Sequence, residues 1–283
     1  MRITILGCGY VGSALARHWQ RRGDHHLRVT TTTPARRQEL AALAEAVQVL
    51  EGSDAEGLAA ALAGRQVAVF SLAPTGKRQV GADGYASTYL RTFEALEQVL
   101  PRLPELRQLI YTGSCSVYGD AEGGWVDETT PPRPHDRHGE ILLASEQRLL
   151  ACAGAGRRVT ILRLGAIYGP GREIGPRLRP LAGSTRAGDG SSYGNWIHRD
   201  DVVGALDWAL VEGVEGIVNL VDDEPLRMRD LFARVLAAEG LAPVCWDPAV
   251  RPAGAAAPPN RRIANRRLHE LGYRLRHPAL KLA

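Results

Sequence analysis

The sequence GCGYVG at residues 7–12 decides the fold class. It follows an apolar run, Arg2–Leu6, which we expect to be a strand, and precedes a helical pattern, Ala14–Arg22, that stops at Gly23. Glycines at this spacing permit a tight turn and let backbone N–H groups at a helix start approach a pyrophosphate. Because the spacing occurs between a strand and a helix, it predicts a dinucleotide-binding unit.

Short apolar runs alternate with helical patterns over the next 150 residues or so. The expected strands are Leu27–Thr32, Val47–Leu50, Gln66–Ser71, Arg107–Thr112 and Val159–Leu164. The expected helices are a segment from the N-cap Thr33 through Ala46, one capped by Ser53–Asp54, and the segments Ala82–Leu100 and Gly139–Ala153. This alternation predicts an α/β fold, a Rossmann-type doubly wound parallel sheet with helices on both faces.

The character of the chain changes near residue 170. Gly, Pro and Arg dominate Gly169–Gly190, which therefore is not a central strand. Helices near Asp201–Val211 and Arg227–Glu239 and a strand at Ile217–Leu220 follow, then a loop at Arg251–Pro259 and a last helix near Ala264–Leu271. We expect residues 1–170 to form an NAD(P)-binding domain and residues 171–283 to form a small substrate-binding lobe, partly interleaved with it.

Composition narrows the classes of partner. The chain has 283 residues with a formal charge of +4, too weak for us to expect a nucleic-acid partner. No apolar run approaches the roughly 20 residues of a membrane helix, and the first strand leaves no room for a signal peptide, so we expect a cytoplasmic protein without membrane contacts. The 4 cysteines lack metal-binding spacing, so no metal is expected. A small-molecule substrate is the expected partner, and a homodimer is left open.

The end of the second strand bears on which cofactor binds. An NAD-preferring fold usually has an acidic residue there for the ribose hydroxyls, but residues 30–33 are four threonines. Arg36 and Arg37 follow and suit a 2′-phosphate, so we expect NADP, with NAD the alternative. The cofactor-binding residues expected from the turn and the second strand are Gly7, Gly9, Tyr10, Val11, Gly12, Thr32, Arg36 and Arg37.

Several further motifs carry a family resemblance. They are YTGSCSVYG at 111–119, VTILRLGAIYGPG at 159–171, NWIHRDDV at 195–202, NLVDDEP at 219–225 and a tail at Asn265 and Leu271-Gly272-Tyr273. With the glycine turn, they resemble the extended short-chain dehydrogenase/reductases of the NAD-dependent epimerase/dehydratase group. The resemblance implies that Leu72, Ala73 and Pro74 pass the adenosine-ribose side of the cofactor.

The catalytic residues of that family match only in part. The family uses a Ser or Thr for the substrate oxygen and a Tyr-x-x-x-Lys pair for the proton, and Ser114 falls on the serine position. His138 stands at the expected tyrosine and Leu142 at the lysine, which is the pattern of the atypical branch of the superfamily. No realignment supplies the lysine, because the two lysines of the chain are Lys77 and Lys281.

Three interpretations of the proton donor follow. His138 acts as acid/base, since imidazole titrates near neutral pH without a lysine. Alternatively a tyrosine such as Tyr118 or Tyr85 supplies the proton, or His138 is only a helix-start residue.

The resemblance also suggests where substrate binds. The residues concerned are Thr88, at the family's upstream asparagine, Ser116, Arg172 and His198. Arg172 suits a phosphate but is equally compatible with a solvated surface, and a packed, hydrogen-bonded role is favoured for His198. Asp200 or Asp201 is expected to be a helix N-cap.

Together these observations predict an NAD(P)-dependent oxidoreductase or epimerase/dehydratase-like enzyme with a degenerate catalytic set. It would act on a small hydroxyl or carbonyl compound, sugar-derived compounds included. The alternative is a non-catalytic NAD(P)-binding regulatory protein, in which Leu142 records the loss of chemistry.

Overall fold

The computed structural model describes residues 1–74, 80–154, 156–250 and 259–280. The chain divides into two compact units that alternate along the sequence. Unit 1 comprises Met1–Val117, Asp136–Arg163 and Val203–Val218, and unit 2 comprises Tyr118–His135, Leu164–Val202 and Asn219–Ala283. The boundary expected near residue 170 thus lies within a stretch of unit 2. Lys77, Lys281 and most of the expected loop at Arg251–Pro259 lie outside the described residues.

A seven-stranded sheet forms the centre of unit 1, in the order β12-β7-β5-β4-β1-β2-β3. Its strands are β1 (Arg2–Leu6), β2 (His26–Thr31), β3 (Ala46–Val49), β4 (Val67–Phe70), β5 (Gln108–Ser114), β7 (Arg158–Leu164) and β12 (Gly216–Leu220). β1 pairs in parallel with β2 on one side and with β4 on the other. The strand order therefore runs outward from β1 in both directions. The crevice at such a change of direction is where doubly wound sheets bind ligands. The predicted Rossmann-type fold is confirmed.

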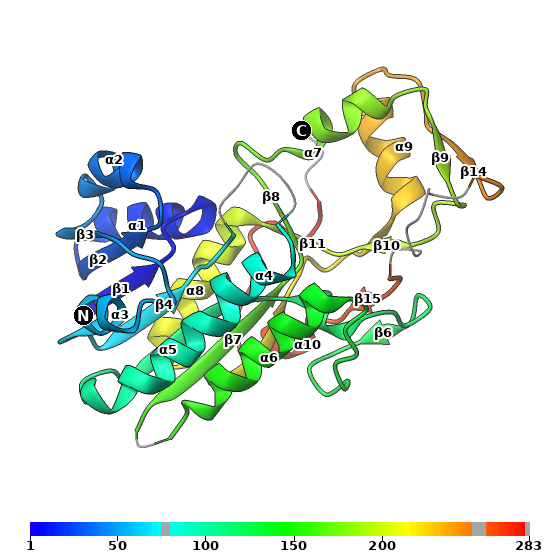
Figure 1. The fold of residues 1–283 in the computed structure, drawn as a ribbon. Coiled ribbons are helices and arrows are strands. Elements are labelled where there is room, and N and C mark those ends of the chain that lie inside the picture. The colour runs from blue at the N-terminus through cyan, green and yellow to red at the C-terminus, as the bar shows by residue number, and fades with distance from the viewer. Residues whose placement is uncertain (75–79, 155, 251–258, 281–283) are drawn as a thin grey trace. The chain divides into compact units, whose positions relative to one another are not determined.

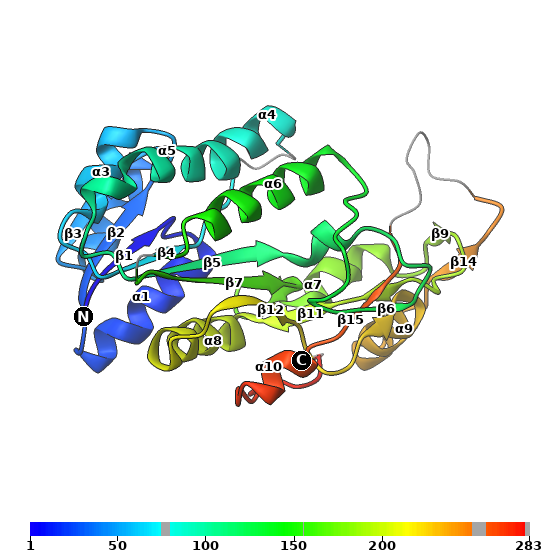
Figure 2. The same ribbon diagram turned by 90° about the horizontal axis from the view of Figure 1, so that it is seen from below.

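Helices cover both faces of this sheet. Figure 2 shows α3, α5 and α6 on one face and α1 and α8 on the other. Their bounds are α1 (Tyr10–Arg22), α3 (Ala55–Leu62), α5 (Arg91–Val99), α6 (Arg137–Ala151) and α8 (Arg199–Glu212). The sheet is apolar on both sides, as in parallel sheets generally, with side chains such as Ile3, Ile5, Phe70 and Leu109 wholly buried.

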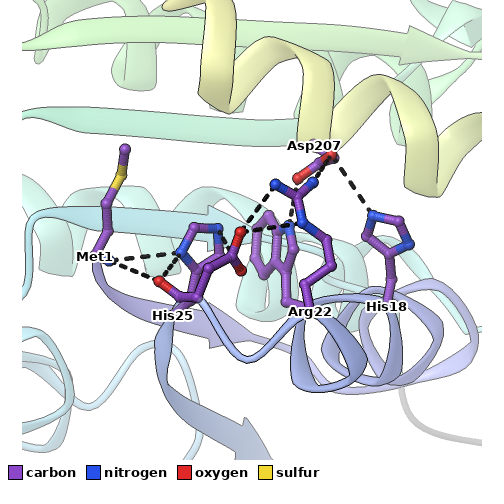
Figure 3. Close-up of polar contacts among 7 residues, drawn as sticks. Met1, His18, Arg22, His25 and Asp207 are labelled. Atoms are coloured by element: carbon purple, nitrogen blue, oxygen red, sulfur yellow. Dashed lines mark hydrogen bonds and ion pairs between the residues drawn. The ribbon is translucent and has the colours of Figure 1, made fainter.

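A polar cluster fastens α1 to α8 (Figure 3). The Asp207 carboxylate accepts a hydrogen bond from Trp19 Nε1 at 2.7 Å and another from Arg22 Nη1 at 2.6 Å. His18 Nε2 lies 3.6 Å from the same carboxylate. The Trp19 side chain is wholly buried, so its indole N–H requires this acceptor. The cluster joins segments that are 188 residues apart in sequence.

Two predicted helices are corrected by the structure. The helix expected from Thr33 through Ala46 is a 3₁₀ turn, η1 (Pro34–Arg36), followed by the short α2 (Arg37–Ala41). Thr33 does not cap it with its side chain, and Ala46 begins β3 opposite Arg28. Sheet pairing here overrides the helix propensity of an alanine-rich segment.

The helix expected over Ala82–Leu100 is not one regular α-helix. It consists of α4 (Ala82–Tyr85), a π-helical turn η2 (Ala86–Leu90), α5 and a 3₁₀ turn η3 (Leu100–Arg102). A π-turn inserts an extra residue into the helix and is frequently found at functional sites. This one begins directly after Tyr85 and contains Tyr89.

Unit 2 is built from short elements. Its helix α9 (Met228–Ala238) carries the buried Leu231, Phe232 and Val235. Its strand pairs are β8 (Ala166–Tyr168) with β11 (Trp196–His198), β9 (Thr185–Ala187) with β14 (Cys245–Asp247), β10 (Tyr193–Gly194) with β13 (Leu226–Arg227), and β6 (Trp125–Val126) with β15 (Arg262–Ile263). Its remaining elements are α7 (Ile174–Leu178), η5 (Arg179–Leu181) and α10 (Arg266–Glu270). Figure 1 shows α7, β9 and β14 beside α9. The 3₁₀ turn η4 (Cys115–Tyr118) belongs to unit 1 except for its last residue, Tyr118. As expected, Gly169–Gly190 supplies no central strand.

The N-cap expected at Asp200 or Asp201 is wrong. α8 begins at Arg199, so both carboxylates lie in its first turn. Asp201 instead is wholly buried and accepts hydrogen bonds from the backbone N–H groups of Arg276, at 2.6 Å, and His277, at 3.0 Å.

Among the described helices, none combines the length and apolarity needed to cross a bilayer.

Candidate active site

The glycines of the first turn serve two different purposes. Gly7 has φ +84°, and a Cβ there would lie 2.4 Å from the Ser71 carbonyl oxygen. A Cβ on Gly12 would lie 2.4 Å from the Gly7 carbonyl oxygen, so both glycines are required by packing. A Cβ on Gly9 would meet nothing within 4 Å. Gly9 therefore leaves open space beside the first N–H groups of α1, which have no partner within the helix, and this cradle fits a pyrophosphate.

The ends of the neighbouring strands support this turn. The Gly7 N–H donates to Thr30 Oγ1 at 3.1 Å, and the Cys8 N–H donates to the Thr30 carbonyl at 2.8 Å. The Leu72 Cα lies 3.3 Å from the position of a Gly7 Cβ, so the structure brings the end of β4 against the turn. Of the other predicted cofactor contacts, Val11 is buried, Tyr10, Thr32 and Pro74 are half-buried, and Ala73 is exposed.

Arg36 and Arg37 have different surroundings. Arg36 Nη1 donates to the Cys8 carbonyl at 2.6 Å and Nη2 donates to Ser13 Oγ at 3.1 Å, so its guanidinium lies against the glycine turn. The same guanidinium binds the Glu39 carboxylate through Nε at 3.2 Å and Nη2 at 3.1 Å, which lowers the pKa of Glu39. Arg37 is exposed. The sequence analysis looked for an acidic residue at the end of the second strand and missed Glu39. This residue lies in α2, and its carboxylate reaches the guanidinium that contacts the glycine turn.

A cleft opens at the carboxyl end of β5 in unit 1. Its lining contains the predicted catalytic residues Ser114 and His138 and the predicted substrate residue Ser116. The full lining is Tyr85, Tyr89, Tyr111, Thr112, Gly113, Ser114, Ser116, Asp136, His138, Gly139 and Leu142. Side chains from β5, α4, η2, η4 and α6 thus meet in one place.

Two serines form the polar wall of the cleft. Ser114 is the last residue of β5, and its Oγ accepts the Ser116 N–H at 3.2 Å. The two hydroxyl oxygens lie 2.9 Å apart, so either can donate to the other. With Ser116 as the donor, the Ser114 proton is free to point at a substrate oxygen. In that arrangement, Ser116 orients and polarises the hydroxyl that the family resemblance assigns to substrate binding.

His138 lies in the first turn of α6. Asp136 is the N-cap, and its Oδ1 accepts the Gly139 N–H at 2.8 Å. His138 Nε2 is 3.1 Å from the Val80 carbonyl oxygen. A carbonyl only accepts, so Nε2 carries a hydrogen and Nδ1 is the nitrogen left to gain or lose a proton. The ring centroid lies 4.2 Å from that of Tyr85.

The position expected for the family's lysine faces the protein interior. Leu142 is 7% exposed, so a cation there would be desolvated. One turn further along α6, Glu146 forms a buried ion pair with Arg163 of β7 at 2.7 Å. A Cβ on Gly113 would lie 2.9 Å from Glu146 Oε1, so this pair closes the floor beside the cleft.

Other predicted site residues are not brought to the cleft lining. The Tyr118 hydroxyl is buried in unit 2 and donates to Asn219 Oδ1 at 2.8 Å. Thr88 lies in η2 with its hydroxyl donating to the Gly84 carbonyl at 2.8 Å. Arg172 and His198 belong to unit 2.

His198 is packed and hydrogen-bonded. Its Nδ1 accepts the Asp200 N–H at 3.2 Å, and its ring centroid is 3.8 Å from that of His277. Burial, reinforced by His277, lowers the pKa of His198. His198, Asp201 and His277 have potential ligand atoms within 4.8 Å of one another. Because Nδ1 and both Asp201 oxygens already accept backbone N–H groups, we interpret the cluster as a tie between α8 and residues 276–277.

Comparison with known proteins fits this geometry. A model of the NAD dependent epimerase/dehydratase family matches residues 3–220. The chain belongs to this family. Protein YeeZ of Escherichia coli (strain K12) is 33% identical over 214 residues, which cover 72% of this chain and 71% of YeeZ. The predicted recognition is confirmed at the level of the family.

Solved structures show the same fold. A functionally unknown conserved protein from Silicibacter pomeroyi DSS superposes with a TM-score of 0.78 at 26% identity, covering 99% of this chain and 95% of that one. DesIV, a dTDP-glucose 4,6-dehydratase from Streptomyces venezuelae solved with NAD and TYD bound, has a TM-score of 0.79 at 22% identity, covering 97% of this chain and 92% of DesIV.

Proposed function

We propose that this protein is an NADP(H)-dependent oxidoreductase that interconverts a carbonyl compound and its alcohol in the cleft between Ser114 and His138. The observation that carries the proposal is the placement of two features on one sheet. The glycine turn follows β1 and Ser114 ends β5, with only β4 between these strands. Both features lie at carboxyl strand ends, where open α/β sheets bind ligands.

The residues of the chain would divide the work of binding. The space at Gly9 and the start of α1 would hold the pyrophosphate. The Arg36 guanidinium would release the Glu39 carboxylate and bind a 2′-phosphate in its place. When bound, the nicotinamide would supply or accept a hydride. Ser114, oriented by Ser116, would hold the substrate oxygen.

His138 would move the proton. Reduction of a carbonyl needs one hydride on carbon and one proton on oxygen. With Nε2–H held by the Val80 carbonyl, Nδ1 would give its proton to the nascent alkoxide, and the neutral ring would regain a proton from solvent. The reverse sequence would oxidise an alcohol.

The test has two stages. Calorimetry should show NADP binding, and absorbance at 340 nm should then show NADPH consumption with a member of a panel of aldehydes, ketones and nucleotide sugars. Ser114→Ala should lower kcat by ~10²-fold or more, whereas Ser53→Ala, outside the cleft, should not. Epimerised product with no net cofactor change would contradict a net redox reaction. Cofactor binding without turnover on the panel would instead favour the regulatory alternative.

A further inference from the structure

The cleft is rich in aromatic rings. Phe, Trp and Tyr make up 6% of the chain, yet three of the eleven residues of the cleft lining are tyrosines, and His138 adds a fourth ring. Their rings form a series, with centroid distances of 4.2 Å from His138 to Tyr85, 5.4 Å from Tyr85 to Tyr89 and 6.5 Å from Tyr89 to Tyr111. Such edge and tilted contacts leave ring faces and edges on which another flat ring can pack.

The backbone of the flanking helix is distorted where it supplies these rings. Tyr85 ends α4 and Tyr89 lies within the π-turn η2, and α5 then resumes with Phe93 wholly buried against Tyr111 at 5.0 Å between ring centroids. Inserting a residue into a helix disturbs its hydrogen bonding and persists where a function or packing requirement maintains it. The turn places Tyr85 and Tyr89 in the cleft lining.

One residue of the cleft lining, Tyr111, has a polar atom without a partner among the described residues. Tyr111 is wholly buried, and its hydroxyl makes no hydrogen bond within the part of the chain that the structure describes. Burial raises the pKa of Tyr111 and of Tyr89, so both phenols stay protonated and able to donate. A buried hydroxyl without a partner is rare in folded proteins, which points to an oxygen or nitrogen of a ligand as its missing acceptor.

The charge of the lining also limits the ligand. Among the lining residues that the structure describes, the formally charged side chain is Asp136, and its carboxylate is negative and already accepts the Gly139 N–H. Apart from the proton that His138 would carry for the reaction, a phosphate or carboxylate placed at this end would therefore meet no positive charge among those residues.

We propose that the cleft takes an aryl carbonyl compound whose ring bears an oxygen substituent, such as a hydroxyaryl aldehyde or ketone. The ring packs against Tyr85 and Tyr89, the ring oxygen accepts from the Tyr111 hydroxyl, and Ser114 holds the carbonyl oxygen. This substrate class rests on the proposed function, because the carbonyl is placed where Ser114 and His138 would reduce it.

Binding and turnover must be measured separately. The probes are 4-hydroxybenzaldehyde, benzaldehyde and UDP-glucose, each titrated into the protein saturated with NADP and followed by saturation-transfer NMR and calorimetry. We expect 4-hydroxybenzaldehyde to bind more tightly than benzaldehyde and UDP-glucose not to compete with it.

Tyr111→Phe removes only the unpartnered hydroxyl. It should reduce the preference for 4-hydroxybenzaldehyde over benzaldehyde by about tenfold, the value of one hydrogen bond, while Tyr85→Leu should weaken both aldehydes. Tyr273→Phe is the matched control, because its hydroxyl donates to the Asp201 carbonyl within unit 2 and its loss should leave the preference unchanged.

The outcomes separate the two proposals. An unchanged preference in Tyr111→Phe, or binding of UDP-glucose but of neither aldehyde, overturns the aryl substrate class. Aldehyde binding that follows the expected pattern without NADPH consumption leaves the aryl site standing and overturns the oxidoreductase function. NADPH consumption with aliphatic carbonyls alone overturns the aryl class and leaves the function standing.

Discussion

The two units handle buried charge differently. In unit 1, the buried Arg163 is paired with Glu146, and Asp207 binds both Trp19 and Arg22. In unit 2, Asp222 is 2% exposed, and neither of its carboxylate oxygens has a hydrogen-bond partner among the described residues. A paired buried charge fixes geometry, whereas an unpaired buried acid prefers to be neutral and ties stability to pH. The turn and cleft residues of unit 1 are expected to respond to mutation in binding and rate, and Asp222 of unit 2 in the pH dependence of stability.

The largest effect is expected at His138. His138→Phe keeps a ring beside Tyr85 but removes the proton donor, so kcat should fall by roughly 10²–10⁴-fold with NADP affinity nearly unchanged. His135→Phe, at an exposed position three residues earlier, should change neither quantity. Turnover and calorimetry on both variants are the measurement. Full activity in His138→Phe would mean that another group donates the proton. Tyr85 is the next candidate, because it also lines the cleft.

A second large effect is expected at the glycine turn. Gly9→Val places a side chain in the open space kept for the pyrophosphate, so NADP affinity should fall by about 100-fold, or about 2.7 kcal/mol. The melting temperature should change little, because nothing lies within 4 Å of the new Cβ. Gly12→Ala is the informative contrast: its Cβ would strike the Gly7 carbonyl, so it should lower stability as well. Equal affinities in wild type and Gly9→Val would mean that the cofactor lies elsewhere.

The glycine turn and the cleft differed in how far they could be predicted. The turn depends on backbone geometry within six consecutive residues, so the spacing of Gly7, Gly9 and Gly12 is sufficient to predict a tight turn between a strand and a helix. The cleft depends on side chains from distant segments. The resemblance proposes Ser114 and His138 as catalytic residues, and the structure places both in the cleft lining. The packing of Tyr85 against His138 joins residues 53 positions apart in the sequence, which no local pattern reveals.

The remaining errors have similar causes. The π-turn at Ala86–Leu90 has no signature in a sequence that reads as a regular helix. Asp201 carries the sequence signal of an N-cap, but the tertiary structure uses its carboxylate to bind residues 276 and 277. For Asp201, a tertiary contact overrides a local capping preference.

An effect of intermediate size is expected on the preference of unit 1 for NADP over NAD. Arg36→Ala should weaken NADP by about 1.5–3 kcal/mol relative to NAD, the value of hydrogen bonds to a charged group. Arg37→Ala, at an exposed position, is the control and should have little effect. Glu39→Gln should strengthen NADP, because the carboxylate that now occupies the Arg36 guanidinium competes with a 2′-phosphate. Wild-type protein that binds NAD more tightly than NADP would contradict the assignment.

The smallest effect is expected in unit 2, as a shift of a few degrees in melting temperature. Burial, followed by the nearby Asp223 and Glu224, raises the pKa of Asp222 to about 8, from an ordinary value of 3.8. Between these values the unfolded chain ionises Asp222 while the folded protein keeps it protonated. Stability therefore falls as pH rises through this window and levels off above about pH 8.

Asp222→Asn removes this titration while keeping the shape of the side chain. Its melting temperature should fall less than that of the wild type between pH 5 and pH 8, and the difference should stay constant above pH 8. Asp230→Asn, an exposed carboxylate in the first turn of α9, should follow the wild-type profile. Parallel profiles for wild type and Asp222→Asn would show that Asp222 is ionised and solvated in the folded protein. The contrast between the Glu146–Arg163 pair of unit 1 and the unpaired acid of unit 2 would then be lost.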